Sequence, residues 1–306
     1  MAGRQTFHSP AKGGLAALEH SRQFSHPTPV RPPRRAFRRG NLPTMIPSPQ
    51  QIQRHLEMLE QKVFQVDTKW PQFKLLLQDC QALAAAVPAE ATVVCLERTL
   101  LYGGVSLFAP LFARQNFISL DCSPGSAESR GAYNQSMVDD ARCLPIPTTR
   151  RGRAEATGLA ASSTDLLLIP NLVHHVADQR GLFAEVHRLL KPGGRGYVFE
   201  PMLRELHQIP DDYLRYTPYG LARVIEEAGM VFERHEPVGG PFTAVAYCWF
   251  QALEYFPEAE RDVIEQWFRT EQWPQLLRWE AQHQINLKRQ HSSFPTAFAV
   301  HFRKPA

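Results

Sequence analysis

Short apolar runs alternate with helix-like patterns from residue 91 onwards. The runs cover 93–96, 117–120, 166–169 and 197–199. Short runs without internal alternation are typical of strands buried on both faces, and helical stretches between such strands favour βαβ units. The pattern therefore predicts an α/β fold built on a mostly parallel sheet that is flanked by helices.

Local signals predict further helix boundaries and strands in the second half. The apolar stripe over 182–190 stops at the Pro-Gly-Gly of 192–194, because the proline ring blocks continuation and glycine permits a left-handed exit. Thr217 and the proline after it predict the start of another helix. Strands are expected over 230–233 and 298–302, so the C-terminal part is predicted to continue the same sheet.

Two helices are predicted before the alternating region. Ser48 is a suitable N-cap, with a proline at the first helical position and Gln51 three residues after the cap. The second helix follows Trp70 and ends near Pro88. We expect four segments: a disordered basic tail over 1–44, a helical flank or lid over 45–88, the core of the fold over 89–205, and a C-terminal part over 206–306 with a helical cap and the final strand.

Residues 1–44 differ from the rest in charge and hydropathy. They hold eight Lys and Arg residues against one acid, so this segment carries +7, and subtracting it from the net +4 leaves −3 for the remainder. A segment without apolar periodicity cannot bury enough surface to offset its ordering entropy. Three interpretations stay open: a translation start that lies at Met45 instead, a solvated basic tail, or an arginine-rich targeting segment.

Composition excludes several classes of protein. No apolar stretch approaches the roughly 18 residues that a membrane-spanning helix needs. The basic excess lies in the first segment rather than along a groove, so nucleic-acid binding is not expected. The cysteines are five, widely spaced and without a Cys-x-x-Cys pair, which argues against disulfides and structural zinc and favours a cytoplasmic setting.

Chemically useful side chains follow the predicted strands. In an open parallel sheet, ligands bind beyond the carboxyl ends of the strands. Glu97 and Asp121 end the first two runs, Asn171 lies just after the third, and Glu200 ends the fourth. These four positions are therefore candidates for a ligand site.

Several motifs together resemble a known family. The Leu-Lys-Pro-Gly-Gly at 190–194 and the Arg-Tyr-Thr-Pro-Tyr-Gly-Leu at 215–221 are the most specific. With the surrounding residues over about 89–240, the chain resembles the class I S-adenosylmethionine-dependent methyltransferases of the type 11 group. The resemblance implies a Rossmann-like, seven-stranded sheet, S-adenosyl-L-methionine as cofactor, and a small-molecule, lipid or glycan-precursor acceptor.

The family's first motif is an acid followed by three glycines at alternate positions. Glu97 matches the acid and Gly103 matches the third glycine, but Thr99 and Leu101 stand at the first two glycine positions. Because glycine there allows a tight turn and a close approach to the ligand, the two side chains are expected to narrow or reshape the pocket. This departure supports an alternative, a non-catalytic binding or assembly protein with an eroded cofactor site.

The resemblance assigns the remaining cofactor contacts. Asp121 matches the acid that accepts hydrogen bonds from both ribose hydroxyls, although an acid at a strand end is often only a helix N-cap. Asp140 matches the aspartate that faces the adenine amino group, with its neighbour Asp139 as the alternative. Ala141 is expected to supply a backbone contact, and Asn171 to lie at the cofactor.

The acceptor side is less well specified by the sequence. We expect His174, His175 or Glu200 to serve as a base where the acceptor must lose a proton. Metal binding by the two histidines is not expected, because successive residues point in different directions and no third ligand has suitable spacing. The acceptor pocket is expected to be walled by aromatic side chains, with core packing as the alternative: Tyr213, Tyr216 and Tyr219.

Residues 241–290 are rich in aromatic side chains and helical in pattern. Packed helices are the favoured interpretation over an acceptor cap or a membrane-contacting surface, because the acids of this segment would repel anionic lipid. A nicotinamide dehydrogenase on the same sheet is disfavoured, because it requires an intact glycine fingerprint directly after the first strand.

Overall fold

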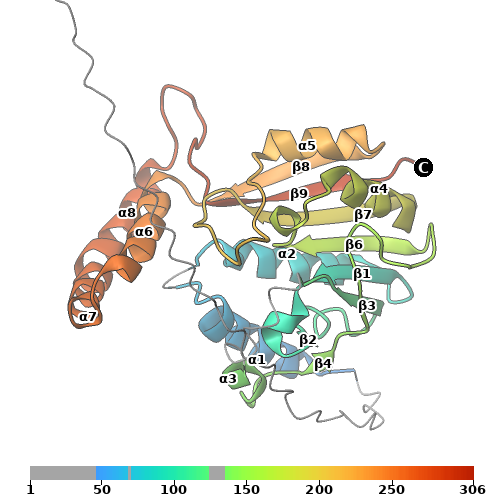
Figure 1. Ribbon diagram of the computed structural model, residues 1–306, viewed down its shortest axis with the longest axis horizontal. Helices are drawn as coiled ribbons and strands as arrows, with labels where there is room; N and C mark the ends of the chain where they lie inside the picture. The colour runs from blue at the N-terminus through green and yellow to red at the C-terminus, as the bar shows by residue number, and fades with distance from the viewer. Residues whose placement is uncertain (1–45, 68–69, 124–134) are drawn as a thin grey trace, which may run out of the picture. The chain divides into compact units, whose positions relative to one another are not determined.

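Seven strands of the computed structural model form one sheet. They are β1 (Thr92–Glu97), β3 (Asn116–Asp121), β5 (Arg150–Arg151), β6 (Thr164–Pro170), β7 (Leu190–Pro201), β8 (Val231–Val238) and β9 (Ala297–Arg303). Their order is β5-β3-β1-β6-β7-β9-β8 (Figure 1). Only β9 runs antiparallel to its neighbours. The predicted Rossmann-like, mostly parallel seven-stranded sheet is confirmed.

The structure describes residues 46–67, 70–123 and 135–306. Residues 45–306 form one compact unit. The prediction of a disordered tail over 1–44 lies outside the described residues. Two very short strands, β2 (Val105–Ser106) and β4 (Ile146–Pro147), pair with each other beside the main sheet.

Eight α-helices are described in these ranges. They are α1 (Pro49–Met58), α2 (Phe73–Ala86), α3 (Gln135–Val138), α4 (Gln179–Leu189), α5 (Pro218–Glu227), α6 (Pro241–Ala252), α7 (Glu258–Trp267) and α8 (Trp273–His283). The predicted caps are confirmed. The Ser48 hydroxyl accepts from the N–H of Gln51, whose side chain accepts from the N–H of Ser48, and the Thr217 hydroxyl caps α5.

The strand predicted over 197–199 starts earlier. Helix α4 ends at Leu189 as predicted, but β7 begins at once, so the Pro-Gly-Gly lies within the strand. Its backbone pairs with the C-terminal strand through the N–H of Lys304 and the carbonyl of Gly194, 2.9 Å apart. At Gly196 a β-carbon would collide with the ring of Phe302, so β7 and β9 pack closely only because this position has no side chain.

Helices cover both faces of the sheet with apolar side chains. On one face, Leu59 and Leu76 from the N-terminal helices pack in a buried cluster with Val93 and Leu166 of β1 and β6. On the other face, side chains of α4 and α5 form a second cluster with the same strands. The N-terminal helices are therefore part of the core that positions the ends of β1 and β6.

The aromatic-rich segment forms a third cluster of its own. Phe250 of α6 packs against Phe268 and against Trp273 at the start of α8. The Glu280 carboxylate of α8 accepts from the N–H groups of Phe242 and Thr243 at the start of α6, at 2.9 and 2.7 Å. The favoured interpretation as packed helices is confirmed for these contacts. Within the described residues, no helix has the length and apolar character needed to cross a bilayer.

Candidate active site

The strand order reverses between β1 and β6, where a ligand site is expected. β1 pairs with β3 on one side and with β6 on the other. The connection after β1 therefore leads to one side of the sheet, and the connection after β6 leads to the other side. Glu97 and Asp121 stand opposite each other in register at the ends of β1 and β3. A cavity of about 30 Å³ lies there, between the end of β1 and residues 170–171 after β6. That volume suits about one water molecule.

Glu97 is a buried structural acid. Its carboxylate accepts from the hydroxyls of Ser106 and Ser119, at 2.6 and 2.9 Å, and from the N–H of Leu107 at 3.2 Å. Burial raises its pKa to about 7, and these hydrogen bonds oppose the rise. The carboxylate therefore holds β1, β3 and the following loop together at the cavity, which Glu97 also lines.

The loop after β1 is built without the first two family glycines. Thr99–Tyr102 forms a 3-10 turn, a conformation that side chains accommodate. Left-handed backbone occurs after this turn, at Gly103 with φ +64° and at Gly104 with φ +78°. The backbone at Thr99 and Leu101 therefore does not need glycine. The prediction that these two side chains narrow or reshape the pocket remains a prediction.

Asp121 is tied to this turn. Its Oδ1 accepts from the backbone N–H of Thr99 at 2.9 Å and from both the N–H and the hydroxyl of Ser123. Its Oδ2 lies 3.7 Å from Nε of Arg151, and the side chain is only 4% exposed. One carboxylate oxygen is therefore used to shape the loop, while the other has acceptor capacity toward a ligand hydroxyl.

Asp140 is held by two cations. Its oxygens lie 3.1 Å from the guanidinium of Arg142 and 2.7 Å from Nζ of Lys62. The hydrogen bonds from Arg142, and to a smaller extent the one from Lys62, hold the pKa of this carboxyl well below its usual range. Ala141 is exposed beside it. The neighbouring acid, Asp139, is exposed.

Two polar side chains border the cavity at the switch point. Asn171 has a left-handed backbone with φ +58°, and its buried Oδ1 has no hydrogen-bond partner among the described residues. Arg98 is buried and donates to Oε1 of Gln208 at 2.6 Å. Desolvation lowers the pKa of Arg98 to about 10, so it stays charged at neutral pH. Sequence reasoning missed Arg98, although it stands directly after the motif acid.

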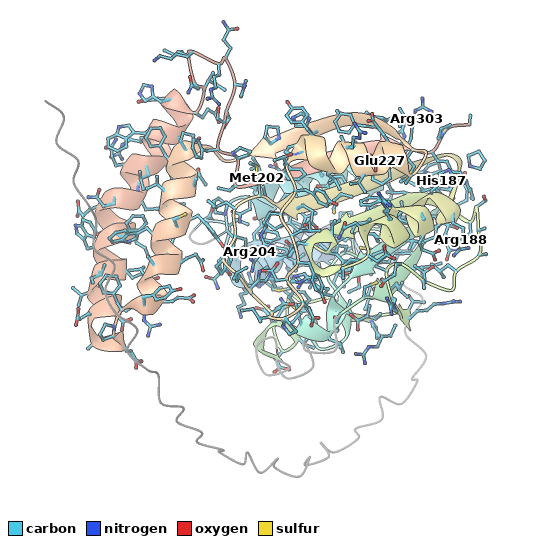
Figure 2. The ribbon with its side chains drawn as sticks, turned by 45° about the horizontal axis from the view of Figure 1, so that its top comes forward. His187, Arg188, Met202, Arg204, Glu227 and Arg303 are labelled. Carbon is cyan, nitrogen blue, oxygen red and sulfur yellow. The ribbon has the colours of Figure 1, made fainter. Side chains whose placement is uncertain are left out.

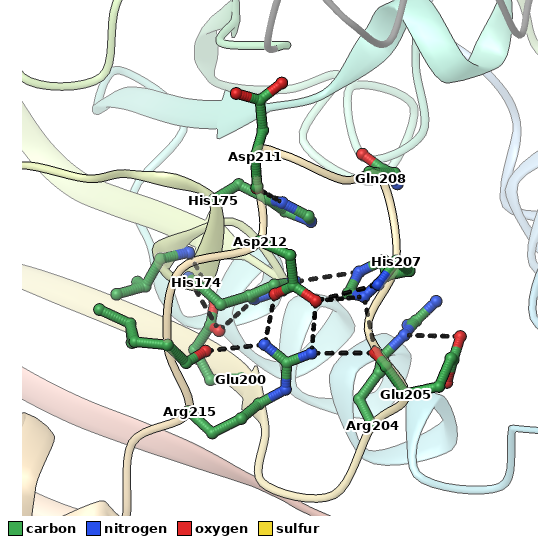
Figure 3. A network of polar contacts seen from close by, with 12 residues as sticks. His174, His175, Glu200, Arg204, Glu205, His207, Gln208, Asp211, Asp212 and Arg215 are labelled. Atoms are coloured by element: carbon green, nitrogen blue, oxygen red, sulfur yellow. Dashed lines mark hydrogen bonds and ion pairs between the residues drawn. The ribbon is translucent and has the colours of Figure 1, made fainter. Parts of the chain in front are cut away.

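His174 and His175 lie in a 3-10 turn after β6, and the structure brings them together with Glu200. Nδ1 of His174 is 2.6 Å from Oε2 of Glu200 (Figure 3). The same carboxylate accepts from the N–H of Val173 at 2.7 Å, so it also caps the turn. Burial raises the pKa of Glu200 to about 8. Glu200 is fully engaged with this turn, which makes it a positioning group.

A third histidine joins this pair from the loop after β7. Nε2 of His207 lies 3.3 Å from Nε2 of His174, and the rings of His175 and His207 meet edge to face. One ring nitrogen from each of the three histidines lies within 4.8 Å of the others. The premise that no third metal ligand is available was wrong. Only the tertiary structure supplies His207.

Burial keeps the three imidazoles uncharged. Desolvation lowers the pKa of His174 well below 6.5, lowers that of His175, and lowers that of His207 to about 4. The nearby guanidinium of Arg98 acts in the same direction on all three. Their ring nitrogens therefore retain lone pairs at neutral pH.

Other charges of the loop are paired around the histidines. The two terminal guanidinium nitrogens of Arg215 donate to the carboxylate of Asp212 (Figure 3). The same carboxylate accepts from the backbone N–H of His207. Arg204 lies 3.6 Å from Glu205 and stacks over Trp70. Figure 2 shows Arg204 on one side of this unit, away from His187 and Arg188 at the end of α4.

The three tyrosines face different surroundings. Tyr213 is half exposed and donates to Asp211, Tyr216 packs against the second core cluster, and the exposed Tyr219 meets His235 of β8. Tyr213 lies nearest the histidines, because its N–H donates to the carbonyl of His174. The structure does not gather the three into one pocket wall.

Comparisons with known proteins come from sequence and from structure. Residues 102–198 match the type 11 family model, described as a methyltransferase domain. A 63-residue match, 40% identical, covers 21% of this chain and 30% of the uncharacterized protein YafE of Escherichia coli (strain K12). The chain thus spans about a third of the length of that curated relative.

Solved structures of similar fold are more distant in sequence. A phosphoethanolamine N-methyltransferase 2 of Haemonchus contortus is 16% identical, with 83% of this chain and 57% of that chain covered and a TM-score of 0.44. A geranyl diphosphate C-methyltransferase of Streptomyces coelicolor A3(2) is 11% identical, with 74% of each chain covered and a TM-score of 0.44. Residues 102–198 of this chain are therefore similar to the methyltransferase domain of the type 11 family.

Proposed function

We propose that this protein is an S-adenosylmethionine-dependent methyltransferase acting on a small-molecule, lipid or glycan-precursor nucleophile. The observation that carries the proposal is Asp121, a buried carboxylate at the end of β3 beside the switch point, within the segment that matches the family. Its Oδ2 suits the ribose hydroxyls, because a carboxylate oxygen accepts two hydrogen bonds.

Other residues are suited to the remaining parts of the cofactor. The backbone at Gly103 permits a close approach, and the charged Arg98 with Asn171 suits a carboxylate at the methionyl end. When bound, the cofactor supplies a methyl group that is already activated on a sulfonium. The polar groups suit the chemistry of the cofactor, but the cavity of about 30 Å³ is too small to hold it, since ligand pockets measure roughly 300 Å³ or more. Binding therefore requires side chains that line the cavity to move.

The histidines after β6 are proposed to act on the acceptor. An uncharged His174 or His175 can take up the proton that a hydroxyl or amine acceptor releases. Glu200 orients His174 through the 2.6 Å contact to Nδ1. Exclusion of water by the buried surroundings favours displacement, and no covalent enzyme intermediate is required.

Calorimetric titration of S-adenosylhomocysteine into the full chain tests the proposal. We expect micromolar binding that weakens at least about 10-fold in Asp121→Asn, because the amide offers one acceptor oxygen instead of two. Glu90→Gln is the control, since it removes an exposed acid just before β1, at the other end of the strand. Equal binding in all three proteins would contradict the assignment of Asp121.

A second candidate is a binding or assembly protein that no longer uses the cofactor. The small cavity beside Arg98 and Tyr102 favours it. Absence of binding at millimolar S-adenosylhomocysteine in a folded, full-length protein would support this candidate and exclude the enzyme. Saturable binding of the cofactor, followed by methyl transfer in a screen of acceptors, would exclude the binding or assembly protein.

A further inference from the structure

The hydrogen bonds around two histidines determine where their protons lie. Nδ1 of His207 is 3.1 Å from the carbonyl oxygen of Glu205, and Nδ1 of His175 contacts the carbonyl oxygen of Asp211. A carbonyl oxygen can only accept, so Nδ1 carries the hydrogen in both rings. Nε2 of each ring therefore carries no hydrogen and has a free lone pair. Among the described residues, Nε2 of His175 is buried without a partner.

His174 completes the arrangement. Its Nδ1 contacts the carboxylate of Glu200, and its Nε2 faces Nε2 of His207 at 3.3 Å (Figure 3). The carboxyl of Glu200 retains its proton at neutral pH and can donate it to Nδ1 of His174, so Nε2 of His174 carries a hydrogen and donates it to Nε2 of His207 in the metal-free protein. A metal ion bound between the rings would take the place of that hydrogen.

We propose that His174, His175 and His207 bind a divalent transition metal of the zinc class through their Nε2 atoms. Zinc–nitrogen bonds of about 2.0–2.1 Å set neighbouring ligands of a tetrahedral site roughly 3.3 Å apart. The His174–His207 separation matches this edge, and the third nitrogen lies within 4.8 Å of both. Small side-chain rotations would bring it to bonding distance.

The surroundings of the rings fit a metal site. Histidine ligands usually donate their other N–H to a carboxylate or a carbonyl oxygen, which orients the ring and raises its basicity. All three rings have such an oxygen at Nδ1. Two of the nearby cations are paired, since Arg215 contacts Asp212 and Arg204 lies close to Glu205, whereas Arg98 donates to the uncharged Gln208.

A bound metal would join two separate parts of the chain. His207 belongs to the loop after β7, whereas His174 and His175 follow β6. The residue after His207 is Gln208, which accepts from Arg98 at the switch point. The metal would thereby hold this loop against the end of the sheet. It would also occupy the lone pairs proposed above to take up a proton, so a histidine cannot serve as ligand and base at once.

The metal proposal does not depend on the proposed function, and its test uses no cofactor. Untagged full-length protein is stripped with a chelator and dialysed, and ZnCl₂ is titrated by calorimetry. We expect one zinc ion per chain with a micromolar or lower Kd. Affinity should fall more than about 100-fold in His207→Gln and about 10–100-fold in Glu200→Gln. Zinc should also raise the Tm of the wild type but not that of His207→Gln.

Controls separate loss of a ligand from loss of the fold. His187→Gln is the matched control, because His187 is half-buried at the end of α4, away from Arg204 (Figure 2). It should bind zinc within about twofold of the wild type. Binding is compared only among proteins with the wild-type circular dichroism spectrum, and His175→Gln replaces His207→Gln if that variant does not fold. Absence of saturable binding by the wild type, or unchanged affinity in both histidine variants, would overturn the proposal.

Discussion

The backbone N–H of Thr99 donates to Oδ1 of Asp121 at 2.9 Å. This contact joins the position of the first family glycine to the proposed ribose-binding acid. It uses a main-chain donor, so it does not depend on which side chain stands at 99. The hydroxyl of Thr99 has another partner, the hydroxyl of Thr148 at 2.6 Å. Backbone and side chain of Thr99 therefore have separable roles.

Thr99→Gly should lower stability while leaving ligand binding intact. Loss of the contact to Thr148 and the greater freedom of glycine in the unfolded chain should together cost about 1–2 kcal/mol. The N–H to Asp121 remains, so the affinity for S-adenosylhomocysteine should change less than about threefold. Urea unfolding and calorimetry measure the two effects. A large loss of affinity without a loss of stability would show that the hydroxyl itself contacts the ligand.

Arg98→Met tests whether Arg98 binds the cofactor or blocks the pocket. If Arg98 binds the carboxylate of the cofactor, affinity for S-adenosylhomocysteine should fall at least about 10-fold. Stability should change by less than about 1–2 kcal/mol, because an apolar side chain of similar length replaces a buried charge. Tighter binding in the variant would mean that Arg98 blocks the pocket. Arg180→Met, which removes an exposed arginine of α4, is the control for net charge.

Glu200→Gln should flatten the pH dependence of stability between about pH 4.5 and pH 8. Burial raises the pKa of Glu200 to about 8, against about 4.5 when unfolded, so the folded state retains a proton that the unfolded state loses. Stability from this group is present below pH 4.5 and is lost as pH rises toward 8. The variant cannot ionise there and should lack this decline. Urea unfolding between pH 5 and 8.5 measures it, and an unchanged slope would contradict the assigned shift.

Glu97, with its pKa raised to about 7, contributes with the same sign. The slope of the free energy of unfolding against pH should therefore become smaller in Glu200→Gln, but it should not reach zero. A double variant with Glu97→Gln should remove more of it, provided that the protein still folds. This comparison separates the two buried acids, whose surroundings differ.

His55 should make the protein sensitive to acid. This buried side chain of α1 accepts from the N–H of Leu144 at Nδ1 and donates from Nε2 to the carbonyl of Leu107, at 3.2 and 3.0 Å. Desolvation lowers its pKa, so its stabilisation is present above pH 6.5 and is lost as pH falls below that value. His55→Gln should cost about 1–3 kcal/mol at pH 7 and reduce the slope below pH 6.5. An exposed control, His283→Gln, should do neither.

Local patterns in the sequence determined most of the secondary structure. Strand and helix positions, the caps at Ser48 and Thr217, and the acids at the ends of β1 and β3 follow from neighbours a few residues apart. Such signals depend on periodicity and backbone chemistry, which are readable along the chain. The early start of β7 was missed, because Pro-Gly-Gly ends a helix without excluding a strand directly after it.

Only the tertiary structure decided the chemistry of the site. His174 and His207 are 33 residues apart and Arg98 and Gln208 are 110 apart, so no local pattern predicts that they touch. The volume of the cavity depends on the packing of Phe64 and of α2 against the strand ends, and the hydrogen bonds of Asp121 depend on the turn after β1. Sequence determines which groups a strand end carries, whereas the packing of distant segments determines which of their atoms face a ligand.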